Sequence, residues 1–181
     1  MTETLDIIAS RYSCRSFQDT PVPEADLRAI AESAVRAPSA KNRQPWRIIV
    51  ITDKQAIEEI DRVGMERLKA SDEAAHSRMM GRGGRMFYNA TAMLVVVTEE
   101  LDSPYPVSMD SGIVASHAVL AAASLGVNSC IAAVPRIAFD DEAISAKYIP
   151  AGFQFSVSIL LGYAATEGSA HEPDLGKIIY M

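Results

Sequence analysis

Apolar residues along the chain follow two spacings, one typical of helices and one typical of strands. Leu27, Ile30 and Ala34 recur every three or four positions, which predicts an amphipathic helix that begins near Pro23. Residues 48–51 form instead an unbroken run of β-branched side chains. Such a run predicts a strand that is buried on both faces.

The same reasoning divides the whole chain into helices and strands. The pattern predicts helices near residues 3–10, 24–37, 54–75, 110–125 and 140–148. It predicts strands at residues 46–52, 92–98, 129–134 and 154–161. This mixture, without internal repeats or a linker, indicates a single α+β domain over residues 1–181.

Two segments lack a regular apolar spacing. Residues 76–85 combine three glycines with three arginines, which predicts a mobile loop after a helix that Gly64 weakens. Residues 167–177 predict an irregular tail that leads into a short, strand-like apolar end at residues 177–180. Because that end is too short to be stable alone, we expect a partner subunit to bury it.

The stretch from Ser111 to Pro135 contains no aspartate, glutamate, lysine or arginine. Its length would suffice to span a bilayer. Interspersed polar residues and the break at Gly126 favour instead a buried helix, a turn and a buried strand. Only a large core or a subunit interface buries a helix that is apolar on most sides, so this helix also predicts association between copies.

Composition narrows the classes of function. The 181 residues include 17 basic and 23 acidic side chains, and the resulting net charge of −6 argues against a nucleic-acid-binding domain. The N-terminus lacks the basic start and apolar core of a signal peptide. Cys14 and Cys130 stand far apart and outside any metal-binding spacing. A single disulfide between them is the alternative, but we expect free thiols in a cytoplasmic protein.

Two short polar segments, placed one helix apart, carry the candidate chemistry. Residues 11–17 (Arg-Tyr-Ser-Cys-Arg-Ser-Phe) offer two guanidinium groups, and arginine suits planar, bidentate recognition of phosphate. Residues 37–46 (Ala-Pro-Ser-Ala-Lys-Asn-Arg-Gln-Pro-Trp) form a polar loop that leads into a buried strand, a common place for a ligand. Together they indicate an anionic, partly planar cofactor. Taken alone, each segment also fits a solvated surface or an ordinary loop.

The order of these segments resembles the nitroreductase family of FMN-dependent oxidoreductases. Arg-x-Ser-x-Arg-x-Phe at residues 11–17 is followed by a helix, by Ala-Pro-Ser-x-x-Asn-x-Gln-Pro-Trp at residues 37–46, and by a strand. Residues 110–126 resemble that family's central helix, and residues 129–131 resemble the strand beside its flavin. The resemblance implies a central mixed or antiparallel sheet flanked by helices. It also implies an intertwined homodimer with a swapped C-terminal segment and two FMN sites at the interface.

The resemblance also implies roles for individual residues. Arg11 and Ser13 would hold the FMN phosphate, and Arg15 would lie at the N1/O2 edge, where a cation stabilises the reduced flavin. Residues 38–42 would come from the partner subunit, and Gln44 would lie near the flavin or the substrate. No side chain is assigned as catalytic, because flavin N5 carries the chemistry. The residues implied for the cofactor are Arg11, Tyr12, Ser13, Arg15, Pro38, Ser39, Ala40, Asn42, Gln44, Cys130, Ile131, Ala132, Ala133 and Lys177.

The chain departs from the family pattern in two places. Ala133, whose backbone would face N5, stands where the family often has glycine, which costs nothing if φ is negative there. In residues 172–177, which match the family's phosphate clamp, Lys177 is the only basic residue, and it stands a few positions late. Arg82 and Arg85 are therefore further candidates for a phosphate, either of FMN or of NAD(P)H at the flavin's open face. The alternative is a solvated loop without a role.

Three functions stay open at this point. In the first, which we favour, NAD(P)H reduces bound FMN and leaves before a small electron-poor acceptor, such as a nitroaromatic or a quinone, enters by a ping-pong mechanism. In the second, the protein is a flavin-binding sensor or carrier without efficient turnover. In the third, the same fold performs other chemistry, such as reductive dehalogenation or flavin fragmentation. None of the three involves a membrane or nucleic acid.

Overall fold

The computed structural model of the chain describes residues 2–99 and 107–181. The helices are α1 (Glu3–Ser10), α2 (Glu24–Val35), α3 (Lys54–Ser71), α4 (Glu73–Met80), α5 (Val107–Ser124), α6 (Arg136–Phe139) and α7 (Glu142–Tyr148), with short 3₁₀ turns η1 (Ala40–Asn42) and η2 (Leu175–Lys177). The strands are β1 (Trp46–Ile51), β2 (Ala92–Glu99), β3 (Asn128–Ala132) and β4 (Phe153–Gly162). The predicted α+β class is confirmed.

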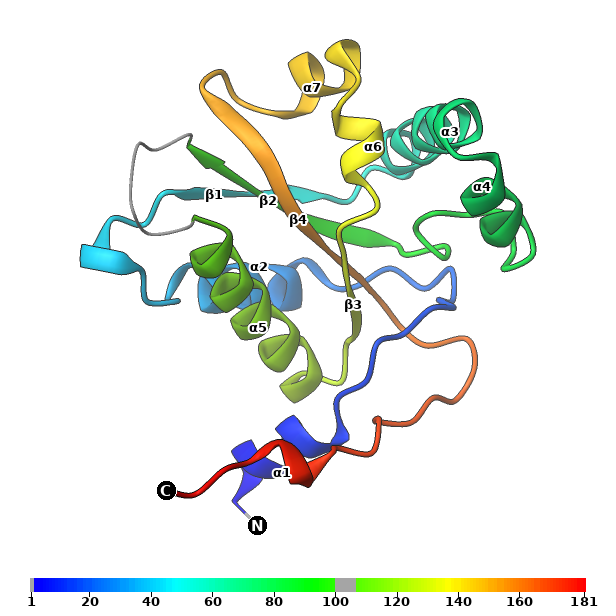
Figure 1. The fold of residues 1–181 in the computed structure, drawn as a ribbon. Coiled ribbons are helices and arrows are strands. Elements are labelled where there is room, and N and C mark those ends of the chain that lie inside the picture. Colours follow the sequence, from blue (N-terminus) through cyan, green and yellow to red (C-terminus); the bar gives the residue numbers. More distant parts are fainter. Residues whose placement is uncertain (1, 100–106) are drawn as a thin grey trace.

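The four strands form one sheet in the order β1-β2-β4-β3, and each neighbouring pair is antiparallel. Helices α2 and α5 pack on one face of this sheet, and α3 and α6 pack on the other (Figure 1). The two apolar layers are therefore separated by the sheet. Of the two arrangements allowed by the sequence, mixed or antiparallel, the described strands adopt the antiparallel one.

Strand β2 lies inside the sheet and is buried along most of its length. Its side chains alternate between the two layers, because successive residues of a strand point to opposite faces. Met93, Val95 and Val97 pack in the layer with α3, whereas Leu94 and Val96 pack in the layer with α2 and α5. Both faces of β2 thus contribute to a core, which explains its continuous apolar sequence.

Strand β1 was predicted to be buried on both faces, and this prediction is wrong. β1 lies at the edge of the sheet, and its middle residues are only partly covered. Val50, for example, is 42% exposed. An unbroken β-branched run does not distinguish an inner strand from an edge strand, because both favour the same side chains.

The predicted helix over residues 54–75 is two helices. Helix α3 ends at Ser71, and the Asp72 carboxylate accepts a hydrogen bond of 2.8 Å from the Ala75 N–H to cap α4. Residues 76–80 therefore belong to a helix and not to a mobile loop as predicted. The irregular part begins only at Gly81. A side-chain acceptor at an N-cap is worth about 1 kcal/mol, enough to restart a helix at a polar position.

Gly64 does not weaken α3 in the way that its helix propensity alone predicts. It lies at the buried face of the helix, directly against Met86. A Cβ atom added at Gly64 would lie 2.9 Å from the Met86 Cε. The missing side chain thus allows residues 85–87 to pack closely against α3.

Helix α5 corresponds to the helix that was predicted at residues 110–125, and it begins three residues earlier, at Val107. Its buried face packs in the layer with α2. Gly126 adopts a φ of +73°, and the Val127 N–H donates to the Ala122 carbonyl at 2.9 Å. This left-handed residue ends the helix as predicted, since glycine takes such a φ without steric cost.

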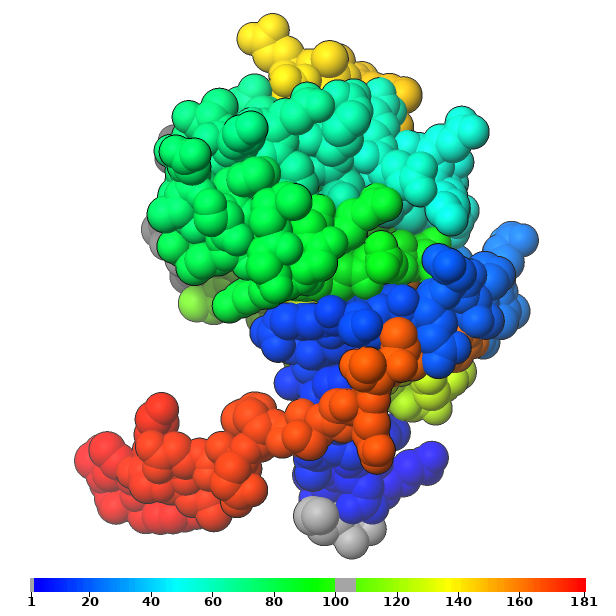
Figure 2. Space-filling view, turned by 90° about the vertical axis from the view of Figure 1, so that its right-hand side faces the viewer, coloured from blue at the N-terminus to red at the C-terminus, as the bar shows by residue number. Residues whose placement is uncertain are grey.

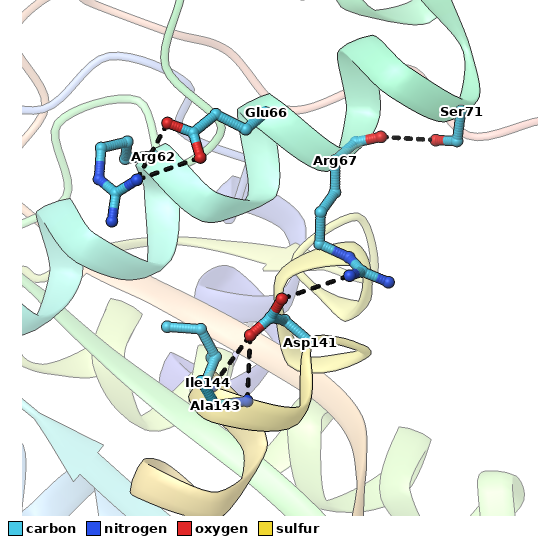
Figure 3. Close-up of polar contacts among 7 residues, drawn as sticks. All are labelled: Arg62, Glu66, Arg67, Ser71, Asp141, Ala143 and Ile144. Carbon is cyan, nitrogen blue, oxygen red and sulfur yellow. Dashed lines mark hydrogen bonds and ion pairs between the residues drawn. The ribbon is translucent and has the colours of Figure 1, made fainter.

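The segment after β3 differs from the prediction. β3 ends at Ala132, two residues early, and α6 follows from Arg136 without having been predicted. Helix α7 was predicted, and its N-cap Asp141 accepts hydrogen bonds from the Ala143 and Ile144 N–H groups (Figure 3). The same carboxylate lies 3.3 Å from Arg67 Nη1 on α3, which ties α7 to the rest of that layer.

The C-terminal end is not a strand in the described chain. Residues 175–177 form η2, and the chain then continues as an exposed segment in which Tyr180 is 90% accessible. Figure 2 shows the tail extending away from the body of the molecule. None of the helices in the described ranges is both long enough and apolar enough to cross a membrane.

Candidate functional site

The first polar segment lies alongside β3. Directly after α1 the chain becomes extended, Ser13 and Ser129 form a parallel bridge, and the Cys14 N–H donates to the Ser129 carbonyl at 2.9 Å. Alternate side chains of an extended segment share a side. Arg11, Ser13 and Arg15 are therefore presented together at the β3 edge of the sheet.

Arg11 and Arg15 both act on the thiol of Cys130, a residue of β3. Burial raises the pKa of the Cys130 thiol, and the positive charges of Arg15 and Arg11 oppose that rise. Burial also raises the pKa of Cys14, whose Sγ donates to the Ser16 carbonyl at 3.2 Å. The two thiols are free and stay protonated at neutral pH, so the local charge is that of the guanidinium groups.

Asn128 fixes this segment, and no pattern in the sequence pointed to this role. Its Oδ1 accepts from the Ala164 N–H at 2.9 Å, and its Nδ2 lies 3.3 Å from the Tyr12 Oη. The Tyr12 ring in turn lies against Gly168, where an added Cβ would clash with it. Asn128 thus joins the polar segment to the end of β4, and Tyr12 is held from both sides.

The second polar segment is a loop with an unusual backbone. Lys41, Asn42 and Gln44 have φ values of 56°, 53° and 49°, a region that residues other than glycine seldom occupy. The Gln44 N–H donates to Ser39 Oγ at 2.8 Å, and Gln44 Nε2 donates to Asn42 Oδ1 at 2.9 Å. Strain held by hydrogen bonds in this way is typical of ligand-binding loops.

The two polar segments lie at opposite ends of α5 (Figure 1). Ala40 N lies 3.4 Å from Asp110 Oδ1 in the first turns of the helix, whereas Arg11 lines a small pocket with Gly126 beyond its last turn. Ser124, the last residue of the helix, lies 14 residues after Asp110, which corresponds to about 21 Å along the helix axis. One chain therefore does not bring the two segments into a single small site.

Residues 130–132 form the second half of β3, an edge strand of the sheet, and Ala133 follows its end. Cys130 is buried, whereas Ile131 is 45% exposed. The Ala132 carbonyl accepts from Ser158 Oγ at 2.9 Å, and the Ala133 carbonyl accepts from the Arg136 N–H at 3.0 Å. Ala133 has no positive φ, so alanine in place of the family's glycine causes no backbone strain.

Lys177 does not join Arg11 and Arg15 within the chain. Its side chain is 82% exposed on the tail, with Nζ 3.9 Å from Asp174 Oδ2. Exposed pairs of this kind contribute little to stability, so the ammonium group is available to a ligand or a second chain.

The remaining candidates, Arg82 and Arg85, differ from each other. Arg82 is exposed in the turn after α4. Arg85 Nη1 lies 3.7 Å from Oδ2 of the buried Asp61, whose Oδ1 accepts from the Met86 N–H at 2.7 Å. Burial raises the Asp61 pKa, and the Met86 N–H and Arg85 oppose the rise. No group of residues in the described ranges could hold a metal ion.

Comparison with known proteins places the chain in a family. Residues 8–162 match the Nitroreductase family, and a protein of Archaeoglobus fulgidus, whose provisional name pairs NADH dehydrogenase with NAD(P)H nitroreductase, is 31% identical over 96% of this chain and 92% of its own. The chain therefore belongs to the Nitroreductase family, a family of oxidoreductase enzymes.

Solved structures agree with this assignment. A Desulfitobacterium hafniense nitroreductase with bound FMN has a TM-score of 0.94 and 40% identity, covering 100% of this chain and 99% of its own. A Bacteroides fragilis nitroreductase with bound FMN has a TM-score of 0.87 at 23% identity, with 100% of both chains covered. At that lower identity the second likeness concerns the fold alone.

Proposed function

We propose that this chain is an FMN-dependent oxidoreductase that passes hydride from NAD(P)H through bound FMN to a small electron-poor acceptor. The observation that carries the proposal is the 40% identity and TM-score of 0.94 to the FMN-bound Desulfitobacterium hafniense nitroreductase. A nitroaromatic or a quinone fits the acceptor. NAD(P)H and acceptor would use the same open face in turn, which gives ping-pong kinetics.

The described residues fit an anionic flavin nucleotide. Arg11, Ser13 and Arg15 lie together on a segment anchored to β3, two cations and a hydroxyl that suit a phosphate and the polar chain beside it. We expect the backbone of Ala132 and Ala133 to face N5. Both carbonyls already accept hydrogen bonds, and Ala132 is also paired with Ser158 in the sheet. Bound FMN would supply the hydride transfer, and Arg15 would stabilise negative charge at N1 and O2.

A second copy of the chain would complete this site. The loop at residues 38–44 lies at the far end of α5 from Arg11, so its strained Asn42 and its Gln44 would reach the flavin of a partner subunit. The solvent side of α5 carries Met109, which is 64% exposed, and the exposed Leu125 follows the last residue of the helix. Asp110, the acidic residue of this helix, is buried. An uncharged exposed helix face is suited to a dimer interface.

The C-terminal tail would add to the same dimer. Residues 178–181 are exposed and mostly apolar, and the tail leaves the body of its own chain (Figure 2). Strand β1 offers an open sheet edge with partly exposed Ile48 and Ile49. An open apolar edge is a ready template for another strand, so we place the swapped tail of the partner there. Lys177 would then reach the site of the partner or its rim.

The absorbance spectrum of the purified protein tests the function most directly. Bound flavin should make the protein yellow, and denaturation should release FMN and not FAD. Anaerobic addition of NAD(P)H should bleach the flavin, and a nitroaromatic or quinone should restore its colour. Protein that stays colourless with excess FMN contradicts cofactor binding. Protein that binds FMN but is not reduced would be a sensor or carrier.

Replacement of Arg82 and Arg85 together by alanine should raise the KM for NAD(P)H and leave the FMN content unchanged. Positive charge near the open face attracts the phosphates of the reductant, an effect that salt weakens. Because Arg85 already pairs with Asp61, we assign most of the effect to Arg82. Steady-state kinetics at two salt concentrations measure it. Loss of FMN would make these arginines the missing phosphate clamp, and no change would make them a solvated surface.

A further inference from the structure

A cavity of about 420 Å³ lies outside the residues assigned to FMN. Its volume falls within the range of small-molecule sites, about 300–1,000 Å³. One wall comes from α3, where residues 54, 57, 58 and 61 share one side of the helix, and the opposite wall comes from residues 85–91. The charged residues of the lining are Asp19, Lys54, Glu58, Asp61 and Arg85.

Asp19 and Pro21 form a third wall, so the cavity brings together distant parts of the sequence. Figure 2 shows the face on which the blue segment near residues 17–22 borders the green segment near residues 85–91. The Thr91 Oγ1 donates to the Thr20 carbonyl at 3.3 Å, and the Phe17 N–H donates to the Tyr88 carbonyl at 3.1 Å. The cavity is thus bounded by hydrogen-bonded segments and does not depend on a single loose loop.

Arg85 is held in position at this cavity. Its Nη1 lies 3.7 Å from the Asp61 Oδ2, while the Asp61 Oδ1 is taken by the Met86 N–H. Asp61 is 6% exposed in its side chain and Arg85 is 48% exposed. At 3.7 Å the contact is an ion pair and not a hydrogen bond, so the guanidinium keeps its N–H donors for a ligand. A fork of donors fixed on one side is suited to a carboxylate.

The other charges of the lining have both signs. Lys54 adds a second cation, whereas Asp19 and Glu58 add carboxylates that are not committed to Arg85. With Asp61 counted, three acidic and two basic side chains line the cavity. A simple anion would meet an excess of negative charge, and a simple amine would leave Arg85 without a partner. A zwitterion satisfies groups of both signs.

The apolar part of the lining completes the chemistry. Ile57, Phe87 and Ala90 belong to the core and present their surfaces to the cavity beside Pro21. The wall also contains Asn89, whose backbone is left-handed at φ 63°, directly after Tyr88 at φ 53°. Such strain persists where surrounding structure fixes it, and it is enriched at ligand sites.

We propose that this cavity binds a free α-amino acid with an apolar side chain. Its carboxylate would lie on Arg85, its ammonium group would lie between Glu58 and Asp19, and its side chain would contact Phe87 and Ile57. The site would be a second, non-flavin site. Apart from the minor share in attracting NAD(P)H that we expect of Arg85, no step of the proposed hydride transfer depends on it, and FMN is not needed to form it.

Three matched probes test the chemistry by isothermal titration and by ligand-observed NMR on the full chain. L-phenylalanine carries both charges, 3-phenylpropanoate lacks the ammonium group, and phenethylamine lacks the carboxylate. We expect L-phenylalanine to bind roughly tenfold or more tightly than either analogue, because each analogue loses a hydrogen bond to a charged group. Equal binding of 3-phenylpropanoate would overturn the zwitterion assignment, and binding of none of the three would overturn the site.

Variants locate the binding within the chain. Arg85→Met leaves a buried carboxylate unpaired, so Asp61→Asn/Arg85→Met serves as a second variant that keeps an acceptor for the Met86 N–H. Either variant should abolish L-phenylalanine binding, and Glu58→Gln should weaken it while leaving 3-phenylpropanoate unaffected. Arg82→Met, which removes an arginine outside the lining, should bind normally. Unchanged binding in the double variant contradicts the proposal.

FMN titration of the same samples keeps the two hypotheses apart. If the cavity is a separate site, the double variant should bind FMN normally while it loses L-phenylalanine. Loss of both ligands would show that the cavity belongs to the flavin site, which contradicts the inference but not the proposed function. A chain that binds L-phenylalanine but not FMN would contradict the proposed function and support the inference.

Discussion

Arg11→Ala should weaken FMN binding by about 1.5–3 kcal/mol, or roughly 10- to 150-fold in Kd. The guanidinium lies on a segment that the Cys14 N–H fixes against Ser129, so its loss removes a charged donor without releasing the backbone. Fluorescence titration of apoprotein with FMN measures the change. Arg15→Ala should also lower the reduction potential of the flavin, because the cation at N1/O2 favours the reduced form.

Arg62→Ala is the matched control for Arg11→Ala. Arg62 pairs with Glu66 on the exposed side of α3, so its replacement removes the same charge from a surface without a candidate ligand (Figure 3). The control should bind FMN normally. An unchanged Kd for Arg11→Ala would mean that the phosphate is held elsewhere, with Lys177 or Arg82 as the next residues to replace.

Deletion of residues 172–181 should lower both the free energy of unfolding and the affinity for FMN. The intact protein should be an obligate dimer with an interface above roughly 2,000 Å². The tail has few contacts with its own chain, so any stability that it provides has to come from a second copy. Denaturant unfolding at several protein concentrations, together with sedimentation, measures both effects.

Two variants separate the apolar part of the tail from its charge. Ile178→Ser/Ile179→Ser keeps Lys177 and should reproduce the loss of stability, because both isoleucines are exposed in the single chain. Lys177→Ala keeps the apolar end and should affect FMN affinity alone. A folded, FMN-loaded monomer in sedimentation would refute the dimer, and a truncated chain as stable as the intact one would refute the role of the tail.

Local periodicity was enough to predict most elements. The apolar face of α2 and the glycine that ends α5 were predicted correctly, because local helix propensity and tertiary packing favour the same structure there. The division between α3 and α4 was missed, although Asp72 is a standard N-cap residue and was a usable signal. The exposure of β1 had no local signal, since strand order depends on pairings with distant residues.

The candidate site was predictable in its residues and not in its geometry. The two polar motifs identify the family, but only the fold shows that the length of α5 separates Ala40 from Arg11. The sequence also had no way to link Asp61 to Arg85, because α3 and the segment before β2 meet only in the folded chain. The roles assigned to Arg82, Gln44 and Lys177 stay predictions until binding is measured.

The alternation of β2 side chains between two layers has a consequence for how the molecule opens. Val95 and Val96 are neighbours in the chain, yet they stabilise cores on opposite sides of the sheet. Because β2 contributes to both cores, its pairing with β4 cannot break without exposing both of them. The domain should therefore melt as one cooperative unit, with the β2 amide protons exchanging with solvent only through global unfolding.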